Sequence, residues 1–256
     1  MKAYLKIYSI SLFLIAILVT GCQSETPIQP VAESNLSSKT LKANIESLLK
    51  DIRLEDKTKT NQLLAALNDL SHLSAKQGYH LKSKTSGVYE NDNYETESFY
   101  QDGRYKSKAV YKSYFTETNF NLADNSVVFY DSVSDVGMKM DNYIKSNDEL
   151  DTLGAMGNFS MPKADSQITA LKLQKFQDKA CLFLEYKDAQ GFFQRQMYID
   201  LETGFVLSQL DYFQDFSKAS ITTELVEITF GPPDQKLFQY SFDAKKIKRS
   251  SDCETG

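Results

Sequence analysis

The chain has 256 residues, a formal net charge of −5 at pH 7, 25% charged residues and 41% hydrophobic residues. This length suffices for one domain with a real core, and the composition is ordinary for a soluble fold. The acidic balance argues against a general nucleic-acid binder, because such a protein needs a basic surface.

The first 21 residues have the features of a secretory signal peptide. Two lysines precede a mostly apolar run at residues 7–19, which is too short to cross a membrane comfortably. The sequence Val-Thr-Gly-Cys that ends at Cys22 resembles the bacterial lipobox. This resemblance implies that Cys22 takes a diacylglyceryl thioether and begins the mature chain. The alternative is an ordinary signal that is cleaved elsewhere, with Cys22 incidental.

Residues 22–38 are rich in Ser, Thr, Gln and Pro, which predicts a flexible tether. Two helices are predicted next, each with one apolar stripe at helical spacing. The first stripe consists of Leu41, Ile45, Leu48, Leu49 and Ile52, and the second of Leu63, Leu64, Leu67, Leu70 and Leu73. Ser37, Ser38 and Thr40 are the candidate caps of the first helix. Because each stripe must be buried, the helices must lie on another layer.

From Tyr79 the hydrophobic period changes to two, which predicts antiparallel strands. The most informative strand follows the hairpin signal at Asp102 and Gly103. One of its predicted faces carries Tyr105, Ser107, Ala109, Tyr111, Ser113 and Phe115, and the other carries Arg104, Lys106, Lys108, Val110 and Lys112. The second face is expected to be wet and basic. The first face either lines a ligand cavity, since its small side chains leave volume, or is ordinary core filled by the helices.

The alternation stops between Asp131 and Gln167, in a stretch that holds Met138, Met140, Met156 and Met161. A short inserted helix is predicted there, from about residue 146 to about residue 157. The methionine content is typical of an adaptable apolar lid. A plain packing segment is the alternative.

Apolar runs within residues 180–216 are separated by turns at 188–191 and 202–204, which predicts a meander of strands. A strand that ends near Phe230 is stopped by two prolines, and residues 237–242 are predicted as a last short strand. Residues 248–256 are predicted to be a mobile tail. An exported location permits a disulfide between Cys181 and Cys253; two free thiols are the alternative.

These elements predict an α+β fold. Its core would be one large curved antiparallel sheet, a half-barrel of about ten strands, closed by the N-terminal helices and the short inserted helix. In the central strands both faces are apolar, since Leu182 and Leu184 alternate with Cys181 and Phe183. A flat sheet with one wet face would not need this pattern, whereas a sheet wrapped around helices would.

The segment 197–207, with its turn at Thr203 and Gly204, resembles the strand–turn–strand of LolA/LolB-like lipoprotein carriers, and segment 228–238 is similar to theirs. The resemblance implies that residues 39–247 form a half-barrel domain whose apolar cavity takes acyl chains or a partner's peptide. The chain departs from the soluble carrier because it carries a lipidation signal. It looks closer to anchored relatives: LolB-type acceptors, mycobacterial lipid-carrying lipoproteins, and spore-envelope lipoproteins that bind an amidase partner.

The sequence predicts no catalytic or metal site. His72 and His80 flank a helix end without a third ligand nearby in the sequence. No phosphate-binding loop and no Gly-x-Ser-x-Gly elbow occurs. The abundant Asp and Glu residues leave a carboxylate pair, and with it a hydrolase, open as a third class.

The predicted function is that of a membrane-anchored, non-enzymatic bacterial envelope lipoprotein without a cofactor, which binds a lipid or acyl chain in the concavity of its sheet. It would be exported and anchored to the outer face of the cell membrane or to the outer membrane. The candidate ligand-binding residues are Tyr105, Ala109, Tyr111, Phe115, Met138, Met140 and Met156. The alternative is a scaffold that binds and positions or regulates an envelope or spore protein, such as a cell-wall amidase.

Overall fold

The computed structural model describes residues 37–50, 52–89, 92–143, 159, 161–213 and 218–249. All of them belong to one compact unit that extends over residues 33–256. The predicted signal peptide, Cys22, the tether up to residue 36, the inserted helix near residue 146, Met156 and Cys253 lie outside the described residues.

Two helices precede the sheet, as the apolar stripes predict. They are α2 (Ser38–Lys50) and α3 (Lys57–Ala75). Each begins at a side chain that accepts a hydrogen bond from the first turn. Ser37 Oγ accepts from the backbone N–H of Thr40 at 3.2 Å, and Asp56 Oδ1 accepts from that of Lys59 at 3.0 Å. Because these N–H groups have no partner within a helix, such caps fix where each helix starts.

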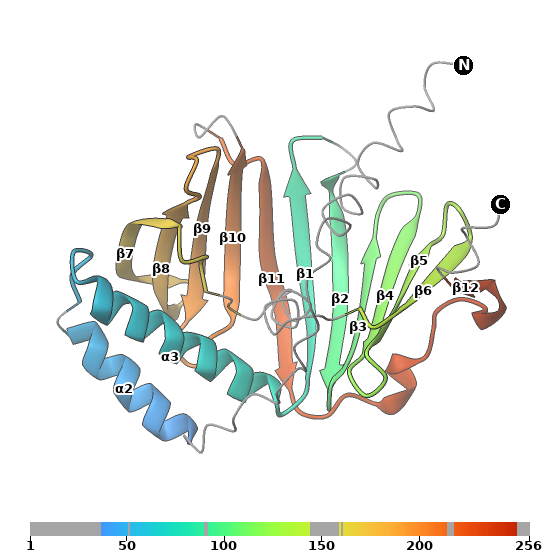
Figure 1. The fold of residues 1–256 in the computed structure, drawn as a ribbon, viewed down its shortest axis with the longest axis horizontal. Helices are drawn as coiled ribbons and strands as arrows, with labels where there is room; N and C mark the ends of the chain where they lie inside the picture. The colour runs from blue at the N-terminus through green and yellow to red at the C-terminus, as the bar shows by residue number, and fades with distance from the viewer. Residues whose placement is uncertain are drawn as a thin grey trace. The chain divides into compact units, whose positions relative to one another are not determined.

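Twelve strands follow within the described residues. They are β1 (Tyr79–Gly87), β2 (Tyr94–Gln101), β3 (Arg104–Val110), β4 (Phe115–Asn121), β5 (Ser126–Asp131), β6 (Val136–Asp141), β7 (Gln167–Phe176), β8 (Lys179–Lys187), β9 (Phe193–Asp200), β10 (Val206–Phe213), β11 (Ile221–Phe230) and β12 (Ile247–Arg249). They form one sheet in the order β12-β6-β5-β4-β3-β2-β1-β11-β10-β9-β8-β7. Its neighbouring strands are antiparallel, except for the parallel pair β12 and β6. This large open sheet with two helices confirms the predicted α+β half-barrel (Figure 1).

The helices lie across the half of the sheet that contains β7–β10 (Figure 1), and we call the face they cover the inner face. The largest core cluster joins Leu41, Ile45, Leu63 and Leu67 of the helices to Leu182, Leu184, Met197 and Ile199 of the sheet. A smaller cluster of Tyr105, Phe120 and Val127 lies on β3–β5 and contains no helix residue among those described. The two helices therefore cover one half of the inner face.

The hairpin between β9 and β10 holds the sheet against α3. Asp200 is buried and its carboxylate accepts from the Glu202 N–H at 3.1 Å and from the Thr203 hydroxyl at 2.9 Å. Gly204 has φ +73°, and a Cβ at this position would lie 2.6 Å from the Leu67 carbonyl oxygen of α3. The Asp-x-x-Thr-Gly motif is therefore required by the turn and by close contact with the helix.

The segment after β11 differs from the prediction. Residues 237–242 do not form a strand. The short 3₁₀ helix η2 (Gln235–Phe238) ends within this stretch, and a second one, η3 (Ala244–Lys246), follows it. The segment packs on the opposite, outer face of the sheet. Arg104 lies over the Phe238 ring at 4.6 Å, and Phe242 stacks on Tyr130 with ring centroids 3.9 Å apart. Of the aromatic side chains that suggested a strand, Phe238 and Phe242 are thus half-buried against β3–β5, whereas Tyr240 is exposed.

The sequence predicted that the outer face of β3 is solvent-exposed and basic, and this prediction is wrong at the centre of the strand. Lys106 and Glu117 are both buried and form an ion pair at 3.3 Å. Lys106 also donates to the Gln239 carbonyl oxygen and, at 3.2 Å, to the Ser241 hydroxyl. The C-terminal segment covers these side chains, which strand alternation alone cannot reveal.

The long excursion begins later than predicted. Residues 132–135 form a turn and Val136–Asp141 form β6, which pairs with β5. Residues 248 and 249, assigned to the mobile tail, belong to β12, in which Ile247 pairs with Gly137. Gly137 favours this close pairing, since a Cβ there would lie 3.2 Å from the Ile247 side chain.

Candidate binding face

The strand register places a set of small side chains together on the inner face of β1–β4. We call this set the floor; it consists of Ser83, Thr85, Thr96, Ser98, Ser107, Ala109, Thr116 and Thr118. Cross-strand partners share a face, and Ser83 pairs with Thr96, which pairs with Ala109. Ser83 also pairs with Leu225, a core residue beside the end of α3. The floor therefore continues the face that the helices cover elsewhere.

Charged side chains are excluded from this part of the inner face. In the described strands β1–β4 and β11, every Asp, Glu, Lys, Arg and His alternates to the outer face. Two of the resulting outer-face pairs are Lys82 with Glu227 at 3.4 Å and His80 with Glu97 at 2.8 Å. The floor thus offers hydroxyl groups and apolar surface but no charge.

The hydroxyl groups of the floor are unequally satisfied. Ser98 Oγ donates to Ser107 Oγ at 3.0 Å, and the hydroxyls of Thr85 and Thr223 lie 3.1 Å apart. By contrast, Ser83 Oγ and Thr96 Oγ1 have no hydrogen-bond partner, although these residues are only 6% and 2% exposed. A buried hydroxyl without a partner costs about 1–3 kcal/mol, so these two positions call for an explanation.

Aromatic side chains border the floor where β2 starts and β3 ends. Tyr94 contacts Tyr111 with ring centroids 4.8 Å apart, and Tyr111 stacks on Tyr114 at 4.3 Å. Burial raises the pKa of Tyr111 to about 12, with a smaller contribution from the two neighbouring tyrosines. Tyr111 was predicted as a lining residue. Tyr94 was not, because its place opposite Thr85 depends on pairing between strands.

The other predicted lining residues divide between the two faces. Ala109 lies half-buried in the floor, whereas Tyr105 is buried against Phe120 and Val127 and belongs to the packed core. The prediction that Phe115 shares the inner face with these residues is wrong. The turn closed by the Tyr111 N–H to Tyr114 carbonyl bond of 2.9 Å resets the alternation, so that Phe115 pairs with Val110 on the outer face.

The two described methionines of the predicted site belong to the sheet and not to a lid. Met138 pairs with Phe129 and Met140 with Val127, so both extend the inner face through β5 and β6. Met138 is exposed and Met140 half-buried. Methionine side chains at such positions can adapt to differently shaped apolar ligands.

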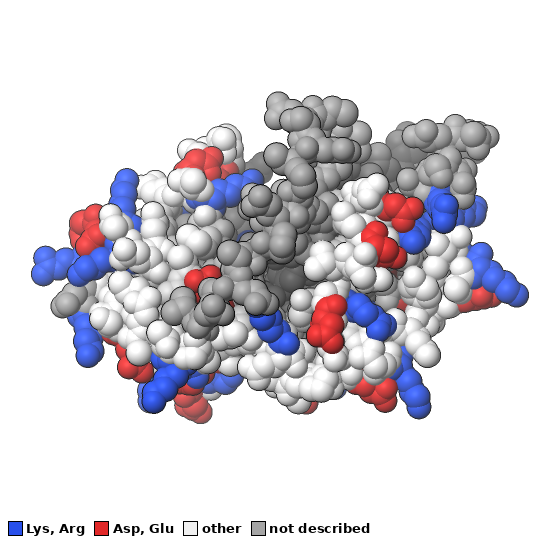
Figure 2. Space-filling model, turned by 60° about the horizontal axis from the view of Figure 1, so that its bottom comes forward, with Lys and Arg blue, Asp and Glu red and all other residues white. Residues whose placement is uncertain are grey.

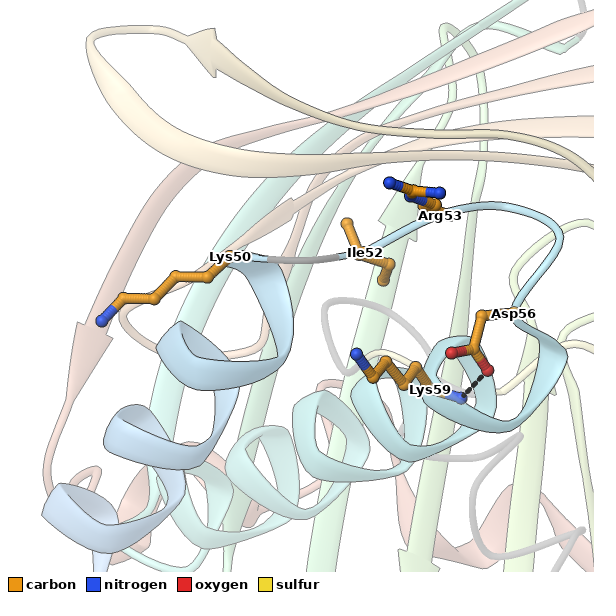
Figure 3. Close-up of a pocket in the computed structure, with 5 residues that line it drawn as sticks. All are labelled: Lys50, Ile52, Arg53, Asp56 and Lys59. Carbon is orange, nitrogen blue, oxygen red and sulfur yellow. Dashed lines mark hydrogen bonds between the residues drawn. The ribbon is translucent and has the colours of Figure 1, made fainter.

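A separate hollow of about 520 Å³ lies at the loop between α2 and α3 (Figure 3). Its lining residues are Lys50, Ile52, Arg53, Asp56 and Lys59. Figure 3 shows the Asp56 carboxylate turned to the backbone of Lys59, where it caps α3, and Lys50 pointing away from the others. With four charged side chains among five, this hollow does not suit an apolar ligand.

The described surface in Figure 2 mixes lysine and arginine with aspartate and glutamate, and shows no patch of one sign. Within the described ranges, no three His, Cys, Asp or Glu side chains gather as a metal site would require. Cys181 is a buried free thiol. No helix in the described part of the chain is long and apolar enough to cross a membrane.

Comparison of the sequence with protein-family models and with curated proteins finds no match. Similar folds occur among solved structures. An uncharacterized conserved protein from Thermus thermophilus matches with a TM-score of 0.51 and 9% identity, over 72% of this chain and 98% of that chain. MucB matches with a TM-score of 0.46 and 11% identity, over 68% of this chain and 61% of that chain.

A LolA superfamily protein, NE2245 from Nitrosomonas europaea, is also similar, with a TM-score of 0.31 and 6% identity over 69% of this chain and 97% of that chain. At such identities the similarity concerns the fold alone. The chain shares its fold, a large open antiparallel sheet with helices on its inner face, with the Thermus thermophilus protein.

Proposed function

We propose that this protein is a membrane-anchored, non-enzymatic lipoprotein of the bacterial envelope that holds a lipid or acyl chain against the floor. The observation that supports this most is the sorting of charge. Strands β1–β4 carry all their ionisable side chains other than tyrosine on the outer face, and their inner face carries neutral side chains, many of them small. The helices pack on the other half of that face. Small side chains bordered by Tyr94 and Tyr111 leave volume that an apolar chain fills well.

The proposed anchor is a lipid on Cys22. Acyl chains contribute about 0.8 kcal/mol per buried CH₂, so that two or more chains hold a protein firmly in a membrane. Fourteen residues lie between Cys22 and Ser37, where the described domain begins. Such a tether reaches at most about 50 Å at 3.3–3.6 Å per residue. The domain would therefore work close to the membrane, at the outer face of the cell membrane or at the outer membrane.

The second candidate is a scaffold that positions or regulates an envelope or spore protein. One observation favours it: β7 is an edge of the sheet, and its Leu173 is 55% exposed. An edge strand can pair with a strand of another chain through its free backbone groups. The exposed loop residues Val88, Tyr89 and Phe192 would suit the same role.

Extraction of lipids from the purified protein separates the two candidates. The chain without residues 1–22 retains every described contact, because all described residues lie in the unit 33–256. Purified from bacterial cells and analysed by mass spectrometry, it should release about one lipid per protein molecule. An empty protein that instead retains a specific envelope protein in a pull-down would support the scaffold.

A further inference from the structure

This inference rests on the proposed function and concerns the two unsatisfied hydroxyls of the floor. Ser83 of β1 and Thr96 of β2 are direct cross-strand partners on the inner face. Both side chains are buried, and neither hydroxyl has a hydrogen-bond partner. Their neighbours Ser98 and Thr85 do have partners, Ser107 and Thr223. The two unsatisfied hydroxyls thus lie side by side between bonded ones, and among the described residues only Thr60, Asn68 and Tyr79 have a further buried side-chain oxygen without a partner.

Such a pair is unfavourable for folding alone. Alanine at position 83 and valine at position 96 would fill nearly the same space without burying an unpaired polar group. A ligand that brings its own polar atom to this place would remove the cost. Buried polar atoms that are left unsatisfied in this way are typical of sites shaped for a partner molecule.

The surroundings decide the chemistry of that atom. A hydroxyl donates to a carbonyl oxygen, and the inner face of β1–β4 and β11 offers no cation to a carboxylate or phosphate. On the same face, Arg195 of β9 is already held by both Asp211 oxygens, at 2.6 and 3.0 Å. An anionic headgroup would therefore be buried without compensation.

Apolar surface adjoins the pair on both sides. Leu225 pairs with Ser83 on one side, and Ala109 pairs with Thr96 on the other. Ala109 has the smallest side chain beside the hydroxyls, and Tyr94 lies next along β2 on the same face. Acyl chains can lie along these residues while a carbonyl group meets the two hydroxyls.

We propose that Ser83 and Thr96 form a hydrogen-bonding subsite for the ester carbonyl oxygens of an uncharged acyl ester, such as a neutral glyceride. The subsite makes the protein prefer an uncharged ester over a free fatty-acid anion of the same chain length.

The test compares two fluorescent probes, a diacylglycerol and a fatty acid, in titrations of the chain without residues 1–22 at pH 7. The unmodified domain should bind the diacylglycerol more tightly. The double variant Ser83→Ala/Thr96→Val should weaken diacylglycerol binding about tenfold and change fatty-acid binding less than about twofold. Its melting temperature without ligand should stay the same or rise, because the unsatisfied hydroxyls are gone.

Two control variants separate recognition from folding. Thr96→Ser keeps the hydroxyl and should retain the affinity for diacylglycerol. Thr222→Val makes the same change as Thr96→Val, but on the outer face of β11, and should leave the affinity for both probes unchanged. Equal loss of both probes with a lower melting temperature would overturn the subsite and indicate a structural role. Preference for the fatty acid would overturn the subsite alone, whereas a domain that binds neither probe would overturn the proposed lipid-binding function as well.

Discussion

The ion pair between Lys106 and Glu117 gives the sharpest test of how the outer face is built. Its side chains are 6% and 0% exposed and their charged atoms lie 3.3 Å apart. The carboxylate also accepts from the Ser241 N–H at 3.2 Å and from the Asn119 amide at 2.8 Å. Replacement of Lys106 by methionine keeps the apolar stem and removes the charge, which leaves the Glu117 carboxylate buried without its cation.

Breaking a buried pair in this way costs about 3–5 kcal/mol. A domain of 150–250 residues loses about 2–4 °C in melting temperature per kcal/mol, so Lys106→Met should lower it by roughly 6–20 °C. The double variant Lys106→Met/Glu117→Leu removes both charges and should recover more than half of this loss. Part of the loss should remain, because the Ser241 N–H then has no acceptor.

Thermal unfolding and urea unfolding, both followed by far-ultraviolet circular dichroism, measure the changes in melting temperature and in the free energy of unfolding. The matched control is Lys82→Met, which breaks the pair with Glu227 whose side chains are 46% and 57% exposed, and which should cost less than about 1 kcal/mol. If Lys106→Met is no more destabilising than Lys82→Met, the C-terminal segment does not cover β3 and β4.

Three further changes test other parts of the molecule. Gly204→Ala places a Cβ 2.6 Å from the backbone of α3 and should lower the free energy of unfolding in urea by at least about 2 kcal/mol. The control Gly191→Ala has the same φ of +73° but no atom within 4 Å of the new Cβ, and should lower it by only about 1–2 kcal/mol. Equal losses in the two variants would contradict the close contact with α3. Ala109→Leu should block uptake of a fluorescent fatty acid with little change in melting temperature. A loss of about 1–3 kcal/mol in a protein that never binds the probe would instead show that the floor is packed core. Cys22→Ser should leave the protein unprocessed or release it from the membrane; unchanged membrane fractionation of a cleaved variant would exclude lipidation as the anchor.

Local patterns predicted much of this fold correctly. The stripes beginning at Leu41 and Leu63 predicted both helices, because a surface helix buries one face and the apolar residues of that face recur at helical spacing in the sequence. The alternation from Tyr105 to Ala109 correctly predicted one common inner face. These features depend on neighbours within a few residues, and such local patterns can be recognised in a single sequence.

The errors depended on distant contacts or on turns. Phe115 was assigned to the wrong face because a turn between two strands can reverse the alternation without any break in the polar pattern. Lys106 was assigned to the solvent because its partners, Gln239 and Ser241, follow it by more than 130 residues. The unsatisfied hydroxyls of Ser83 and Thr96 could not be predicted either, since their pairing across β1 and β2 and their burial follow only from the folded sheet.

Photochemical labelling tests most directly whether a lipid lies on the floor. The chain without residues 1–22 would be loaded with a diacylglycerol whose acyl chain carries a diazirine, irradiated, digested and mapped by mass spectrometry. The account predicts labels on inner-face residues such as Ala109, Tyr111 and Phe129, and their loss in Ala109→Leu. Labels confined to outer-face residues such as Val110 and Thr222, or unchanged labelling of Ala109→Leu, would contradict it.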